Sequence, residues 1–106
     1  MIERRRAKRF QVDWPVRIEG RFGAGEGFIE SGVLSNISSG GALLLLPYPL
    51  SPRTKIDVYI KLPLQGRKWM RYPARVLRVE HGVASAAAVR FDAPRPDFKS
   101  PLGLVN

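Results

Sequence analysis

Two stretches of this chain alternate between apolar and polar residues, and this period of two constrains the fold more than any other feature. Apolar side chains occupy every even position from Phe10 to Ile18, and again from Ile56 to Leu62. Such alternation places one face of a β-strand in a core and the other in water, whereas an amphipathic helix needs a spacing of three to four. No stretch of the chain has a strong helical spacing. The sequence therefore predicts an all-β protein.

Turn residues divide the remaining sequence into further strands. We expect Gly20 to Gly32, which holds five glycines, to be a flexible hairpin connection, and His81-Gly82 to be a tight turn. We expect the long strand before that turn to bend near Pro73, because proline lacks the N–H that a ladder needs. The predicted strands span residues 10–19, 32–38, 42–46, 54–62, 67–80 and 83–91.

Six short antiparallel strands favour a closed barrel, because closure removes exposed strand edges. The fold class predicted is therefore a six-stranded antiparallel β-barrel with a flexible basic N-terminal arm. We divide the chain into an arm over residues 1–9, a barrel over residues 10–92 and a C-terminal tail over residues 93–106, which holds three prolines and no expected long element.

Length and composition exclude several classes of protein. At 106 residues the chain forms one domain. It has no cysteine, which excludes disulfides, a thiol nucleophile and thiolate metal sites. Its longest apolar run, residues 42–50, is far shorter than the ~20 residues of a membrane span. No apolar stretch follows the first residues, so we expect no secretory signal, no membrane insertion and a cytoplasmic location.

Catalytic chemistry has little support in the sequence. The only histidine, His81, adjoins a predicted turn glycine, where an exposed turn residue is the ordinary interpretation. The carboxylates are scattered, so they suggest neither an acid–base pair nor a metal site. We therefore expect no catalytic residues, no metal, no cofactor and no enzymatic activity.

The formal net charge of +9 is the first feature that points to a partner. Five of the nine residues in the arm are basic, and a second cluster contains Arg67, Lys68, Arg71, Arg75 and Arg78. Such a balance favours an anionic partner, although a solvated, solubilising surface would have the same composition.

Two motifs give that partner a chemical identity. The first, just before the first strand, contains Arg5 and Arg9 in the spacing RxxxR; the second, residues 36–41, matches (D/N)xSxxG. Each alone is weak, since turns commonly contain Asn, Ser and Gly. Together, on an all-β chain that also has Trp14-Pro15-Val16 in its first strand, they resemble the PilZ domain family over residues 3–91.

The resemblance implies a bacterial second-messenger receptor that binds cyclic diguanylate (c-di-GMP) and signals when its arm becomes ordered. It implies that Arg5 and Arg9 bind phosphate and guanine, and that Asn36, Ser38 and Gly41 line a pocket on the barrel. In similar proteins an arginine at the position of Arg4 accompanies an intercalated dimer of the ligand. The candidate c-di-GMP contacts are Arg4, Arg5, Arg9, Asn36, Ser38, Gly40, Gly41 and Arg78, the last as a candidate for the outer guanine or as a solvent-facing strand residue.

The residue chemistry fits such a ligand. A guanidinium can hold a phosphate through two hydrogen bonds, pair with the O6 and N7 edge of guanine, or stack on a base. Gly40 and Gly41 permit positive φ and leave room for a ligand to approach the backbone. Asn36 stands where most family members have aspartate, so it retains the acceptor but loses the charge that pairs with a guanine edge.

Two other functions remain open at this stage. A small basic barrel can bind single-stranded nucleic acid if exposed aromatic side chains alternate with basic ones, and only residues 67–72, with Trp69 and Tyr72, have that pattern. We therefore do not expect nucleic acid to be the partner. A PilZ-like protein can also act through protein contacts alone, but such relatives typically lack the arginine motif. Whether the chain acts as a c-di-GMP receptor or through protein contacts alone, its sequence does not identify the downstream protein effector.

Overall fold

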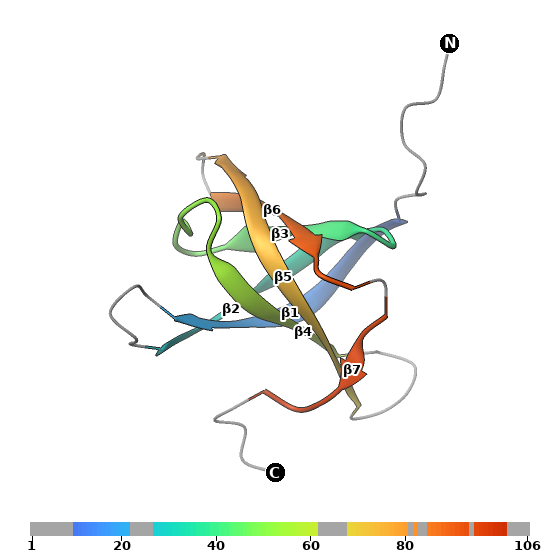
Figure 1. The fold of residues 1–106 in the computed structure, drawn as a ribbon. Coiled ribbons are helices and arrows are strands. Elements are labelled where there is room, and N and C mark those ends of the chain that lie inside the picture. Colours follow the sequence, from blue (N-terminus) through green and yellow to red (C-terminus); the bar gives the residue numbers. More distant parts are fainter. Residues whose placement is uncertain are drawn as a thin grey trace.

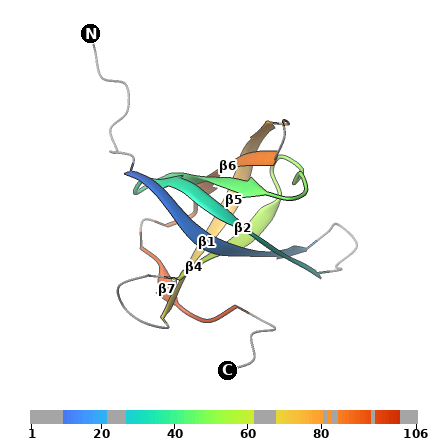
Figure 2. The same cartoon turned by 180° about the vertical axis from the view of Figure 1, so that it is seen from behind.

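The computed structural model describes residues 10–21, 27–61, 68–80, 82, 85–93 and 95–101. Its strands are β1 (Phe10–Arg21), β2 (Gly27–Ile37), β3 (Gly41–Leu46), β4 (Lys55–Lys61), β5 (Trp69–Glu80), β6 (Ser85–Phe91) and the short β7 (Asp97–Phe98). The strand order is β4-β1-β2-β3-β6-β5, all antiparallel, and pairing of β4 with β5 closes the barrel. Figure 1 shows β5 crossing the front of the barrel, and Figure 2 shows β1 and β2 on the opposite side. The predicted six-stranded antiparallel barrel is confirmed.

The apolar side chains of the alternating stretches fill the barrel interior. Val16 and Ile18 of β1 and the even positions of β4 point inward, and Ile18, Val58 and Ile60 have no exposed surface. Leucine and alanine side chains of β3 and β6 complete the layer, while Tyr72 and Phe91 stack with ring centroids 4.1 Å apart. Burying this apolar surface is the main favourable contribution to folding, at about 25 cal/mol per Å².

Most of the segment from Gly20 to Gly32, which we predicted to be a flexible connection, proves to be strand. β1 extends to Arg21 and β2 begins at Gly27, so the two strands form a long hairpin that projects from the barrel (Figure 1). The glycines allow close packing: a Cβ on Gly20 would lie 2.5 Å from Cζ of Phe28. Gly20 therefore leaves space for the ring of Phe28, while Gly23 and Gly25 lie outside the described residues.

Pairing of β5 with β4 continues through Pro73, and the register of β5 against β6 shifts between Val76 and Arg78. The bend expected near Pro73 stays a prediction. One other detail of the predicted strands was wrong. Tyr59, predicted to face water, is only 1% exposed. Its cross-strand partner Arg71 also pairs with Asp97, so β7 lies alongside this part of β5.

The predicted N-terminal arm, residues 1–9, lies outside the described residues, as does His81. Within the described part of the chain, no helix is long and apolar enough to cross a membrane.

Candidate functional site

The turn between β2 and β3 is held by Ser38. Its backbone N–H donates to the carbonyl oxygen of Gly41 at 2.9 Å, and its hydroxyl accepts from the N–H of Gly40 at 3.3 Å. The N–H of Phe91 donates to the carbonyl oxygen of Gly40 at 2.9 Å, which ties the turn to β6. Residues of the (D/N)xSxxG motif thus build a fixed turn on the barrel, as Ser and Gly commonly do.

The two glycines of this turn serve different purposes, and neither adopts the left-handed backbone that we expected them to permit. A Cβ on Gly41 would lie 2.2 Å from the carbonyl oxygen of Val89, so glycine is needed there for the approach of β3 to β6. A Cβ on Gly40 would meet nothing within 4 Å. Gly40 therefore leaves open space on the surface, which a ligand can use. The only described residue other than glycine with a positive φ is Arg53.

Beside this turn the outer surface of β3, β5 and β6 forms a cavity of about 410 Å³. It brings together four of the eight residues predicted as ligand contacts, although they come from two distant parts of the chain. Its described lining is Ser38, Gly40, Gly41, Ala42, Leu43, Leu77, Arg78, Glu80, Ala88, Val89 and Arg90. Asn36 is half-buried in β2, opposite Leu43, and is not in this lining.

Sequence reasoning missed Arg90 and Leu77, which also line the cavity. Arg90 is the cross-strand partner of Gly41, and Leu77 is 56% exposed. The signal for Arg90 was present, because Val89 and Phe91 on either side of it point inward. Leu77 lies at the β5 irregularity, which no local pattern predicts.

The cavity is flanked by basic side chains. Arg78 lies 4.0 Å from Glu80, and both are well exposed, so that pair contributes little. Arg75 and Arg90 are direct cross-strand partners on the outer face, and Lys55 is opposite Arg75 on the other side. Like charges directly opposite each other destabilise a sheet, so this arrangement favours an anionic ligand that would relieve the repulsion.

The remaining predicted contacts, Arg4, Arg5 and Arg9, lie outside the described residues. The point where the arm joins the barrel is nevertheless defined, because Phe10 pairs with Ile37. Ile37 immediately precedes Ser38, so the arm is attached beside the β2–β3 turn.

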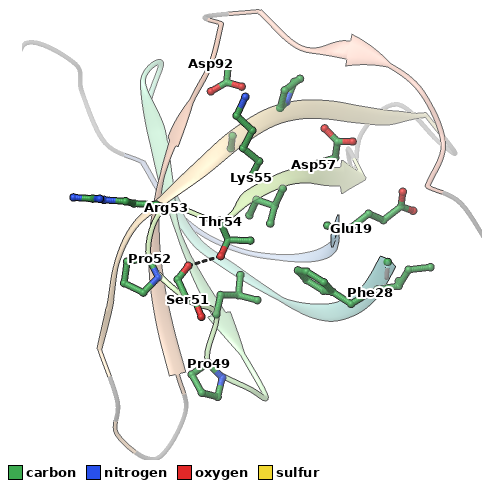
Figure 3. Close-up of a pocket in the computed structure, with 17 residues that line it drawn as sticks. Glu19, Phe28, Pro49, Ser51, Pro52, Arg53, Thr54, Lys55, Asp57 and Asp92 are labelled. Carbon is green, nitrogen blue, oxygen red and sulfur yellow. Dashed lines mark hydrogen bonds between the residues drawn. The ribbon is translucent and has the colours of Figure 1, made fainter. Parts of the chain in front are cut away.

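The described residues outside this cavity bear on metal binding and contain a second, larger groove. No group of three or more His, Asp or Glu side chains within the described ranges could hold a metal ion. A larger groove, of about 1250 Å³, lies between the β1–β2 hairpin and the β3–β4 loop (Figure 3) and contains none of the predicted contacts.

Comparison with known proteins places this geometry in a family context. The model of the PilZ domain family matches residues 3–103. The structure is similar to Bacillus subtilis inhibitor of motility, MotI/DgrA (20% identity, TM-score 0.68, covering 86% of this chain and 44% of that one). It is also similar to the PilZ domain of Escherichia coli YcgR with c-di-GMP (17% identity, TM-score 0.65, covering 85% of this chain and 79% of that one). A third similar structure is the PilZ domain of CeSA from a cellulose-synthesizing bacterium (25% identity, TM-score 0.56, covering 78% of this chain and 79% of that one). The chain thus spans less than half of MotI/DgrA. No curated protein sequence matches it.

Proposed function

This chain belongs to the PilZ domain family, and we propose that it is a c-di-GMP receptor that binds its ligand in the cavity beside the β2–β3 turn. The observation that carries the proposal is the convergence of Ser38, Gly40, Gly41 and Arg78 on one open cavity, with the arm attached next to it. The YcgR domain, solved with c-di-GMP, has a similar fold, which supports the same ligand here.

Different residues around the cavity would contact different parts of the ligand. Gly40 leaves the surface clear, so a flat guanine can approach the backbone of the turn. Arg78 and Arg90 supply planar, permanently charged donors at the edge of the cavity, suited to a phosphate or to the O6 and N7 edge of guanine. Leu77 and Ala88 offer apolar contact to a base face. Asn36 contributes indirectly, from the strand that leads into the turn.

The arm would complete the site. Arg5 and Arg9 would bind the phosphates and guanines from the side opposite the barrel, and the ligand would draw the arm onto the cavity. Fixing backbone costs about 1–2 kcal/mol per residue, so several charge-assisted hydrogen bonds are needed to offset it. We therefore expect strong binding only when both arginines engage. The resulting change of surface is the signal that a protein effector would read.

A nucleic-acid function has less support. Tyr72 packs inward against Phe91, and Trp69 is half-buried with Nζ of Lys61 5.9 Å from its ring centroid. The two aromatic residues of the basic stretch are therefore engaged within the protein rather than presented as a stacking platform. Binding, not catalysis, is the activity we assign to this domain.

Titration calorimetry with c-di-GMP at about physiological salt, with GTP and GMP as controls, tests this proposal. We expect saturable, selective binding that falls at least tenfold in Arg5→Ala and in Arg9→Ala, and is unchanged in the matched control Arg95→Ala. Two ligands per chain would indicate that c-di-GMP binds as an intercalated dimer. In that case Arg4→Ala should lower the stoichiometry to one ligand per chain. Unchanged binding in both arm variants would overturn the site assignment.

A further inference from the structure

Three neighbouring strands of the barrel have no charged residue over most of their length. Residues 31–52 and 82–89 contain no Asp, Glu, Lys or Arg, although such residues make up 25% of the chain. The fold brings these two stretches together, because β3 pairs with β2 on one side and with β6 on the other. Alternate residues such as Leu34, Leu44 and Ala87 fill the core, so the residues between them face outward. We call this outward surface the uncharged band; it contains Ser31, Val33, Leu43, Leu45, Ala86 and Ala88.

The centre of the uncharged band is an apolar row, with one side chain from each of four neighbouring strands. Val33 of β2 lies opposite Leu45 of β3, and Pro15 of β1 and Ala86 of β6 extend the row at its two ends. Val33 is 39% exposed and Leu45 is 36% exposed. Figure 2 looks onto this side of the barrel, with β1 and β2 in the foreground. An exposed apolar surface that is rimmed by polar residues commonly marks an interaction site.

Opposite charges flank the apolar row on β1. Asp13 and Arg17 lie two residues before and two residues after Pro15, on its outward side, and neither has an ion-pair partner among the described residues. A twofold axis along the apolar row would place β1 of one copy antiparallel over β1 of another. Asp13 of each copy would then face Arg17 of the other copy. The surface is therefore complementary to itself in charge as well as in apolar character.

We propose that the uncharged band is the interface of a homodimer whose twofold axis runs along the apolar row. The formal net charge of +9 makes two copies of the chain repel each other over most of their surface. At the uncharged band they can meet without bringing like charges together. The exchange of Asp13 and Arg17 across the axis identifies the occupant as a second copy, because a different protein would have to supply both charges in the same arrangement.

The size of the interface sets the strength of the dimer. Four strands at about 4.8 Å spacing and the 6 residues of β3 give the surface a flat area of about 400 Å² per copy. Interfaces of this size are at the low end for specific complexes, so we expect a dissociation constant of about 10–100 µM. Leu43 and Ala88 also line the cavity beside the β2–β3 turn, so the dimer is a property of the nucleotide-free chain. The proposal does not depend on the identity of the ligand in that cavity.

Sedimentation velocity of the full nucleotide-free chain, from about 5 to about 500 µM, tests the proposal. We expect the sedimentation coefficient to rise from the monomer to the dimer value over this range. Leu45→Glu should weaken self-association at least tenfold, because two carboxylates would meet at the axis. The matched control Phe98→Glu adds the same charge at a 68% exposed apolar residue of β7 and should have no effect. A parent chain that stays monomeric throughout, or a dimer that Leu45→Glu does not weaken, would overturn the proposal.

A pair of charge reversals tests the direction of the axis. Asp13→Arg and Arg17→Asp should each weaken self-association about tenfold, because each places like charges opposite one another. An equimolar mixture of the two variants should dimerise as strongly as the parent chain, because each variant then supplies the charges that the other lacks. A mixture that stays monomeric, with both variants folded by circular dichroism, would overturn the proposed axis. If Arg17→Asp does not fold, Leu45→Glu and its control decide the proposal by themselves.

Discussion

Two parts of the outer barrel surface use the same residue types in opposite ways. On the covered face, formed by β1, β4 and the first half of β5, Arg71 pairs with Asp97 and lies 3.8 Å from Asp57, while the Tyr59 hydroxyl bonds to Glu19. On the open face, formed by β3, β6 and the second half of β5, Arg75 and Arg90 lie opposite each other without an acidic partner among the described residues.

The difference shows how to tell structural charges from binding charges. On the covered face Arg71 is paired with Asp97 and lies near Asp57, and β7 lies alongside it. On the open face the cations are exposed and adjoin a cavity with a clear glycine surface. Arginine content alone does not distinguish the two, since residues 71 and 75 lie on one strand, four residues apart. Pairing within the fold decides which cation remains available for a ligand.

The largest expected effect concerns the glycines at the edge of the open face. Gly41→Ala should lower the free energy of unfolding by about 2–3 kcal/mol, because its Cβ would overlap the backbone oxygen of Val89. Gly40→Ala should change it by less than about 0.5 kcal/mol, because its Cβ would meet only open space. Urea denaturation monitored by tryptophan fluorescence measures both. Equal stabilities for the two variants would show that the β3–β6 approach is not tight.

The second prediction concerns Arg71→Ala, a substitution on the covered face. It removes the cation shared by Asp57 and Asp97 and loosens β7, so we expect a loss of about 2 kcal/mol in unfolding free energy. The affinity for c-di-GMP should remain within twofold of the parent, because the side chain lies away from the cavity. A large loss of affinity in a folded Arg71→Ala variant would contradict the division into two faces.

The covered face also predicts a dependence of stability on alkaline pH. Burial, followed by the charges of Glu19 and Asp57, raises the pKa of Tyr59 to about 12 from an ordinary 10.0. The unfolded chain therefore loses this proton first, and stability declines as pH rises from 10 toward 12. We expect Tyr59 to account for about 1–2 kcal/mol of that decline. Denaturation of Tyr59→Phe across this range should show a shallower decline, and an identical slope would exclude Tyr59 as its source.

The smallest expected effect is that of Arg75→Ala, on the same strand as Arg71. Arg75→Ala should raise the free energy of unfolding by about 0.3 kcal/mol, opposite in sign to Arg71→Ala, because it relieves repulsion from Lys55 and Arg90. It should also weaken c-di-GMP two- to threefold through the loss of a nearby positive charge. Thermal denaturation and calorimetry test the two effects, and destabilisation by Arg75→Ala would contradict the absence of an acidic partner.

The candidate site could be predicted from sequence only in part. The turn at Ser38 to Gly41 was readable as a motif, and Arg78 as one of a basic cluster. Arg90 was missed because its role depends on pairing with Gly41, about fifty residues earlier in the chain. The extent of the pairing between β2 and β3 was equally hidden, since it depends on how far β3 reaches along β2.

The amino-acid pattern alone determined that the chain forms strands and which face of most strands is buried, because side-chain alternation is a local property of extended backbone. It also determined the β2–β3 turn through Ser38 and its glycines. Only the tertiary structure decided that Tyr59 is buried beneath a charged cluster, that Gly20 packs against Phe28, and that Arg71 is paired while Arg75 is not. These outcomes depend on contacts between segments distant in sequence, which local periodicity does not specify.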